Sequence, residues 1–233
     1  MKIVAMIPAR MGSKRIKRKN LRMINGKQLI EYVLDTVSKI NIFDDVYINS
    51  EDDVFKEISD KYNFKFYKRP EHLSSDVATN DEFAHDFLKK TKCEILIQIL
   101  PTSPFITEEE IINFTNKIVK DGLDTLISVE HKQIACIYED KSINFEKLKR
   151  NPPSQTMKPV KAYATALMGW RRIKYMENMD KFGVSYHGGD GKTGYFELRG
   201  LSTIDIDREE NFNLAEAVAF SKTNKSSNEP KTT

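Results

Sequence analysis

The residues with the clearest chemical potential form a cluster of cations near the start of the sequence. Thirteen consecutive residues contain no acid and seven basic side chains: Arg10, Lys14, Arg15, Lys17, Arg18, Lys19 and Arg22. Gly12 and Ser13 lie inside this stretch, where small residues permit a turn whose backbone amides face outward as an anion nest. Lysine and arginine side chains neutralise phosphate oxygens and hydrogen-bond them. The pattern predicts a polyphosphate-binding loop, with a solvated basic loop or a nucleic-acid patch as the alternative.

A short buried strand must position this loop. The apolar run from Lys2 to Ile7 has the length of a strand and ends at Pro8, directly before the cations. Open α/β sheets bind ligands outside the carboxyl ends of their strands. This placement favours a ligand-binding loop.

Two carboxylates near the end of the chain are the second candidate. Asp205 and Asp207 alternate with Ile204 and Ile206 in an expected strand over 201–206, so both carboxylates should share one face. Mg²⁺ takes one or two carboxylates together with phosphate oxygens and water. Adjacent acids are common in a chain of which 30% is charged, but a polyphosphate loop in the same chain strengthens the metal interpretation, because a nucleoside triphosphate requires magnesium.

The elements that carry these residues alternate between strand and helix. Strands are expected over 45–49, 64–67, 94–100 and 125–129, and helices over 29–37, 50–61, 81–90, 107–119 and 212–220. This order predicts an α/β fold with a doubly wound, mostly parallel sheet, in one domain over residues 1–221. From about 138 to 200 the pattern is irregular and predicts an insertion of short strands and turns. The polar tail over 222–233 is expected to be disordered.

Composition and charge limit the classes of partner that this protein can bind. The net charge is +3 and the basic loop alone contributes +7, so the remainder sums to −4. Positive charge confined to one place indicates a small anionic ligand and no nucleic acid. The sequence contains two cysteines, Cys93 and Cys136, and its opening apolar run is too short for a leader or a membrane span. We therefore expect a cytoplasmic protein with reduced thiols and no membrane partner.

The basic loop also carries a resemblance to a known family. Ile7-Pro8-Ala9-Arg10, Gly12-Ser13-Lys14 and Lys19-Asn20 resemble the IPAR-x-GSK-x(4)-KN signature of the CMP-sialic acid synthetases. These are cytidylyltransferases that activate nonulosonic acids. The stretch TIDIDREEN at 203–211 is similar to the closing SIDIDxxxD motif, with Asn211 at the third acidic position. The resemblance covers residues 3 to about 219.

The resemblance implies a Rossmann-like nucleotidyltransferase that uses CTP, Mg²⁺ and a sugar-acid acceptor. By matched position, Arg10, Lys14 and Lys19 would hold the triphosphate and stabilise the leaving group, and Asp205 and Asp207 would bind Mg²⁺. Further matched positions would contact the substrates: Ala9, Gly12, Ser13, Asn20, Arg69, Thr79, Asn80, Leu100, Pro101, Thr102 and Ser103. The resemblance also implies a homodimer in which the segment 138–200 reaches the partner's pocket.

Two positions depart from the family pattern, and both belong to the acceptor pocket. Leu100 precedes Pro101-Thr102-Ser103-Pro104 where these synthetases usually carry a sugar-contacting glutamine, and Ala164 lies where the family commonly reads NGA. The sequence therefore leaves the identity of the acceptor sugar acid undetermined. The SKRIKRKN form of the first motif is similar to the pseudaminic and legionaminic acid branch of the family. The alternatives are a 3-deoxy-manno-octulosonate cytidylyltransferase and a CTP-binding protein without turnover.

Overall fold

A seven-stranded sheet forms the middle of the computed structural model, which describes residues 1–227 and side chains as far as Thr223. The strand order is β11-β7-β10-β6-β1-β4-β5, and of these seven described strands β10 alone runs antiparallel to its neighbours. The strands are β1 (Ile3–Pro8), β4 (Asp45–Ser50), β5 (Lys65–Lys68), β6 (Ile95–Ile99), β7 (Thr125–Lys132), β10 (Val160–Arg171) and β11 (Thr193–Glu197). The predicted α/β fold with a mostly parallel sheet is confirmed.

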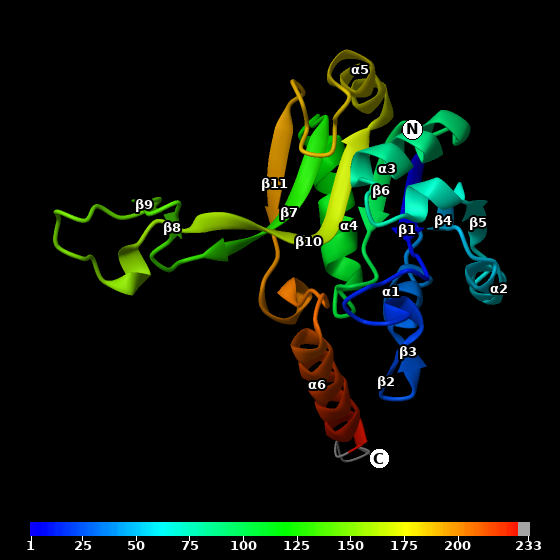
Figure 1. Ribbon diagram of the computed structural model, residues 1–233, viewed down its shortest axis with the longest axis horizontal. Helices are drawn as coiled ribbons and strands as arrows, with labels where there is room; N and C mark the ends of the chain where they lie inside the picture. Colours follow the sequence, from blue (N-terminus) through cyan, green and yellow to red (C-terminus); the bar gives the residue numbers. More distant parts are fainter. Residues whose placement is uncertain (228–233) are drawn as a thin grey trace.

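Helices cover both faces of this sheet (Figure 1). Buried side chains of α1 (Leu29–Val37), α2 (Val54–Lys61) and α4 (Glu108–Lys120) pack on one face with Ile3, Ala5 and Ile7 of β1. Those of α3 (Asn80–Lys90) and α5 (Arg172–Phe182) pack on the other face with Val4 and Met6. Because successive strand side chains point to opposite faces, an uninterrupted apolar run such as β1 is buried on both sides.

The last helix, α6 (Glu209–Ser227), packs away from the sheet against the short hairpin of β2 (Met23–Ile24) and β3 (Lys27–Gln28). Its apolar contacts are Phe212, Ala215 and Ala219, which meet Ile16 and Ile24. The prediction of disorder from residue 222 is wrong as far as Ser227, because the helix continues that far; residues 228–233 lie outside the described chain. No helix in the described part is both long and apolar enough to cross a bilayer.

The predicted insertion over 138–200 is wrong for residues 160–197. The twelve-residue strand β10 lies between β6 and β7, α5 follows it, and β11 forms the edge of the sheet. Only an arm projects, formed by the ends of β7 and β10 with the hairpin of β8 (Ile137–Tyr138) and β9 (Lys141–Ser142) (Figure 1). A register shift between Tyr163 and Met168 interrupts the pairing of β10 with β7, and this interruption hid the strand from a pattern-based prediction.

Candidate active site

The predicted motifs meet at the carboxyl edge of the sheet. β1 lies between β4 and β6 and runs parallel to both, so the segments that follow Pro8, Ser50 and Ile99 leave the sheet at the same edge. β5 joins β4 in the same direction and delivers Arg69. The order of the strands therefore places the basic loop, Arg69 and the segment 100–103 around one region.

Two cations at the start of the basic loop pair with the carboxylate of Asp76. Lys14 Nζ lies 2.8 Å from Asp76 Oδ2, and Arg10 Nη1 lies 3.5 Å from Asp76 Oδ1. Arg10 also donates to the carbonyls of Ser74 at 3.2 Å and Ser75 at 3.0 Å. The hydrogen bond from Lys14 holds the pKa of Asp76 below its ordinary value. Two cations predicted to bind phosphate are thus paired with an anion from the loop that precedes α3.

The end of the basic loop contacts the predicted metal ligands. Lys19 Nζ donates to the carbonyl of Ile206 at 2.6 Å and to Asp207 Oδ1 at 3.1 Å. Arg15 Nη1 lies 3.2 Å from Asp207 Oδ2. The first and last sequence motifs therefore form one site.

The strand expected over 201–206 is absent from the structure. Residues Gly200–Thr203 form a 3-10 helix, and 204–207 run without strand pairing toward α6. Ile206 is buried and both aspartates are partly exposed, but Ile204 is partly exposed as well, so the predicted burial of both isoleucines holds only at Ile206. The backbone amide of Ile206 donates to the carbonyl of Thr102 at 2.8 Å, which ties this segment to the loop after β6.

The donor set at this edge fits a magnesium ion. Asp205 and Asp207 offer hard carboxylate oxygens, and Mg²⁺ is commonly held by one or two carboxylates while phosphates and water complete its octahedron. Within the described chain, no group of three or more His, Cys, Asp or Glu residues is placed to hold a metal. A cation here would depend on a bound polyphosphate for its remaining ligands.

Arg69 is buried, with 4% of its surface exposed. Its Nε donates to Asn49 Oδ1 at 2.7 Å and its Nη2 to the Asn49 carbonyl at 2.6 Å, while the guanidinium lies 4.5 Å from the centre of the Phe83 ring. Burial lowers the pKa of Arg69 to about 10. Sequence reasoning missed Asn49; a polar residue at the carboxyl end of a predicted strand was the available signal.

The other predicted substrate residues lie at the same edge in varied settings. Asn20 is buried and donates to the carbonyl of Arg10 at 3.4 Å. The Thr79 hydroxyl accepts from Glu82 N and caps α3, and Asn80 Oδ1 accepts from Gln98 Nε2 at 3.4 Å. Leu100 N donates to the Ala166 carbonyl at 2.9 Å. Ala9, Pro101 and Ser103 are buried, Ser13 and Thr102 are half-buried, and Gly12 is exposed.

The predicted outward-facing amides of the basic loop are partly used inside the chain. Met11 N donates to Glu51 Oε1 at 2.8 Å, and Ser13 N donates to the Met11 carbonyl at 3.0 Å. Because two of the amides already have acceptors, phosphate recognition in this conformation falls mainly on the side-chain cations.

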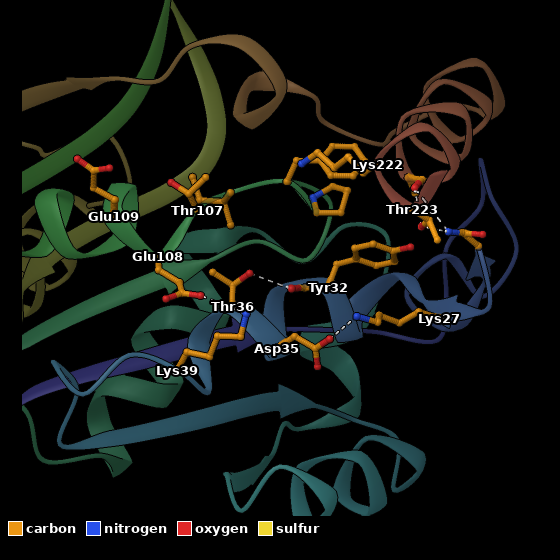
Figure 2. A pocket seen from close by; sticks show the side chains of 15 residues that line it. Lys27, Tyr32, Asp35, Thr36, Lys39, Thr107, Glu108, Glu109, Lys222 and Thr223 are labelled. Atoms are coloured by element: carbon orange, nitrogen blue, oxygen red, sulfur yellow. Dashed lines mark hydrogen bonds and ion pairs between the residues drawn. The ribbon is translucent and has the colours of Figure 1, made fainter. Parts of the chain in front are cut away.

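A separate pocket lies between α1, the loop after β6 and the end of α6 (Figure 2). None of the predicted site residues lines it. Two ion pairs lie in its lining: Lys27 with Asp35, and Lys39 Nζ with Glu108 Oε1 at 3.2 Å. Lys222 Nζ lies 4.9 Å from the centre of the Phe105 ring. Because the predicted site residues gather at the carboxyl edge of the sheet and none lines this pocket, that edge is the candidate active site.

The fold and this edge define an α/β protein that brings cations and carboxylates together at the carboxyl end of a mostly parallel sheet. A family model described as cytidylyltransferase matches residues 4–220. The chain belongs to the cytidylyltransferase family, and the family predicted from the first motif is confirmed.

Curated relatives carry related names. The N-acylneuraminate cytidylyltransferase of Escherichia coli is 29% identical over 187 residues, which cover 80% of this chain and 40% of that protein. The post-translational flagellin modification protein B of Campylobacter coli is 25% identical over 232 residues, or 92% of this chain and 93% of that protein. A pseudaminic acid cytidylyltransferase of Campylobacter jejuni is 42% identical over 81 residues, about a third of each chain (34% and 35%).

Solved structures share the architecture. A CMP:2-keto-3-deoxy-manno-octonic acid synthetase aligns with a TM-score of 0.72 and 15% identity over 95% of this chain and all of that one. The 4-diphosphocytidyl-2C-methyl-D-erythritol synthase of Anaerococcus prevotii aligns with a TM-score of 0.67 and 19% identity over 94% of this chain and 96% of that one. At these identities the likeness shows the fold.

Proposed function

We propose that this protein transfers CMP from CTP to a nonulosonic sugar acid and releases pyrophosphate. The contact of Lys19 with Asp207 carries the proposal, because it joins a predicted triphosphate cation to a predicted magnesium ligand. Family membership and the names of the curated relatives support the use of CTP and a sugar acid.

In the proposed reaction, an oxygen of the sugar's anomeric hydroxyl forms a bond to the α-phosphorus of CTP. The bond from the α-phosphorus to the bridging oxygen of the β-phosphate breaks, pyrophosphate leaves, and the hydroxyl proton passes to solvent. Catalysis of this kind depends on positioning and on neutralising charge. Arg10, Lys14 and Lys19 would exchange their present carboxylate and carbonyl partners for phosphate oxygens.

Asp205 and Asp207 would hold a magnesium ion, which supplies charge neutralisation at the phosphates when bound. Arg69 would contribute a fixed, buried guanidinium to the nucleotide pocket, oriented by Asn49 and Phe83. Cytosine offers O2 and N3 as hydrogen-bond acceptors, and a guanidinium is a donor without acceptor capacity. The base and ribose of CTP would therefore lie toward Arg69, Asn20 and Asn80.

The acceptor would be a nine-carbon sugar acid other than plain N-acetylneuraminate. Leu100 and Ala164 both depart from the family pattern. Leu100 N bonds the bulged part of β10 at Ala166, and Ala164 is buried in the same strand. The relatives include one named for pseudaminic acid as well as one named for N-acylneuraminate.

The arm would join two copies into a homodimer. It exposes large apolar side chains far from the core, with 61% of Ile134, 62% of Ile137, 66% of Tyr138 and the whole of Leu148 accessible. Several large apolar side chains exposed on one projecting segment support an interaction surface there.

Pyrophosphate release tests the proposal. Purified protein with Mg²⁺ is assayed against N-acetylneuraminate, legionaminate, pseudaminate and 3-deoxy-manno-octulosonate, with CTP, UTP or ATP as the nucleotide. Release with CTP and either legionaminate or pseudaminate is expected, and release only with N-acetylneuraminate would contradict the proposed acceptor. Release only with 3-deoxy-manno-octulosonate would move the assignment to that synthetase, and CTP binding with no release would indicate a binding protein without turnover.

A further inference from the structure

Thr165 has a backbone conformation that β-branched residues rarely adopt. Its φ is +51°, in the left-handed region that glycine, asparagine and aspartate occupy more readily. The residue lies inside β10, where extended backbone is the rule. Such a conformation persists only where the surrounding structure imposes it, and it is frequent at functional sites.

A bulge in β10 imposes this conformation. Tyr163 pairs with Val129 and Met168 with Ile127, so five steps along β10 face two steps along β7. Two hydrogen bonds fix the extra segment at its C-terminal end, just before Met168. The Ala166 carbonyl accepts from Leu100 N at 2.9 Å, and Leu167 N donates at 2.9 Å to the hydroxyl of Ser128, which is fully buried.

The bulge turns the Thr165 side chain toward a predicted magnesium ligand. Thr165 Oγ1 donates to Asp205 Oδ2 at 3.1 Å. The neighbouring amide of Ile206 is held by the Thr102 carbonyl at 2.8 Å. Asp205 is thus held in two ways: β10 holds its side chain, and the loop after β6 holds the backbone of its neighbour Ile206. Its Oδ2 accepts the hydrogen bond from Thr165, which leaves Oδ1 as the oxygen for a cation.

We propose that Thr165 is a positioning residue for the cation site: the bulge in β10 places its hydroxyl on Asp205 and sets the orientation of that carboxylate before nucleotide and metal bind. The inference rests on the proposed function, in which Asp205 is a magnesium ligand. Partners that orient a ligating carboxylate typically change metal affinity by about 10- to 100-fold when removed. Glycine would adopt this backbone without strain, but it has no hydroxyl to hold Asp205.

Three substitutions distinguish the effect of the Thr165 hydroxyl from the effect of the strained backbone. Thr165→Val keeps the β-branched shape and the strain and removes only the hydroxyl. Thr165→Ser keeps the hydroxyl. Thr165→Gly relieves the backbone and removes the hydroxyl. Each variant is checked for folding by circular dichroism, and Mn²⁺ binding in the presence of CTP is measured by electron paramagnetic resonance.

The expected result is a Mn²⁺ dissociation constant about tenfold higher for Thr165→Val and Thr165→Gly, with Thr165→Ser close to wild type. The KM for CTP should change less than kcat, because the residue acts on the cation site. Unchanged Mn²⁺ affinity in Thr165→Val would overturn the inference.

Asp205→Asn distinguishes this failure from failure of the proposed function. If Asp205→Asn abolishes Mn²⁺ binding while Thr165→Val leaves it unchanged, only the role of Thr165 is overturned. If Asp205→Asn also binds Mn²⁺ and turns over normally, both the metal assignment and the inference built on it are overturned.

Discussion

Lys19 and Asp207 form an ion pair across 188 positions of sequence, with Lys19 Nζ 3.1 Å from Asp207 Oδ1. The Lys19 side chain is only 14% exposed, so the pair is shielded on the lysine side. It joins the loop after the first strand to the segment before the last helix. One site therefore contains both a cation suited to phosphate and a carboxylate suited to a metal.

Replacing Asp207 with alanine should abolish turnover and leave the fold intact. A metal ligand supports several kcal/mol of transition-state stabilisation, so we expect kcat to fall by at least about 100-fold. Pyrophosphate release gives the rate, and circular dichroism gives the fold. Glu209→Ala is a matched control, because Glu209 also pairs with an arginine of the basic loop, Arg22, but is more exposed. Near-normal activity of Asp207→Ala would contradict the metal assignment.

Replacing Asp76 with asparagine should tighten CTP binding. Asp76 neutralises Arg10 and Lys14 in the free protein, and a bound triphosphate must displace it. Exposed ion pairs contribute up to about 1 kcal/mol, so the dissociation constant should fall by about two- to fivefold at low salt. Calorimetric titration at low and high salt measures this, and the gain should shrink at high salt. Glu71→Gln in the same loop is the control, and weaker binding by Asp76→Asn would refute the competition.

Replacing Arg69 with methionine should destabilise the fold and raise the KM for CTP. The change leaves Asn49 without its buried donor, which costs about 1–3 kcal/mol. In a chain of this length each kcal/mol lowers the melting temperature by about 2–4 °C. Lys68→Met, one residue earlier at an exposed ion pair with Asp53, should change stability by less than about 0.5 kcal/mol. Equal melting temperatures for the two variants would contradict a structural role for Arg69.

Asp45 should make the stability of the sheet sensitive to acid. Burial alone would raise its pKa, but hydrogen bonds from Lys2 and Lys65 outweigh burial and lower the pKa below its ordinary value. The ionised form therefore stabilises the folded state above the unfolded pKa of about 3.9, and this contribution disappears as the pH falls through the lower folded value. Urea denaturation across pH should show that wild type has a higher free energy of unfolding than Asp45→Asn at neutral pH, and that this difference disappears below about pH 4. A difference in unfolding free energy that stays constant with pH would contradict this role of the Asp45 carboxylate.

A charge on the arm should separate the proposed dimer. Ile137→Glu combined with Tyr138→Glu places two anions on exposed apolar positions of the hairpin. Size-exclusion chromatography with light scattering should then report a monomer where wild type is a dimer. The core should melt as before, because neither residue packs on the sheet. A Lys141→Glu variant on the facing strand tests for a general charge effect, and a wild-type monomer would refute the proposal.

Much of the fold could be predicted because its elements are locally encoded. The buried run of β6 and the helical spacing of α1 are visible as periodicity. The helix expected over 107–119 is confirmed as α4, and Thr107 and Glu110 form a capping box at its start, with both partners within one turn. β10 could not be predicted in this way. Its bulge breaks the alternation at Thr165, and its antiparallel place between β6 and β7 depends on pairing with strands far away in sequence.

The sequence by itself determined the chemistry available to this protein: a run of cations after the first strand, an aspartate pair near the end, and the motifs that identify a cytidylyltransferase. Tertiary structure alone decided which groups meet. The pairing of Asp76 with Lys14, of Asn49 with Arg69 and of Thr165 with Asp205 joins residues from different elements. Residue types and local spacing can be read from short stretches of sequence. These contacts instead depend on the order and register of the strands in the sheet, and hydrogen bonds and core packing between distant parts of the chain determine that order and register.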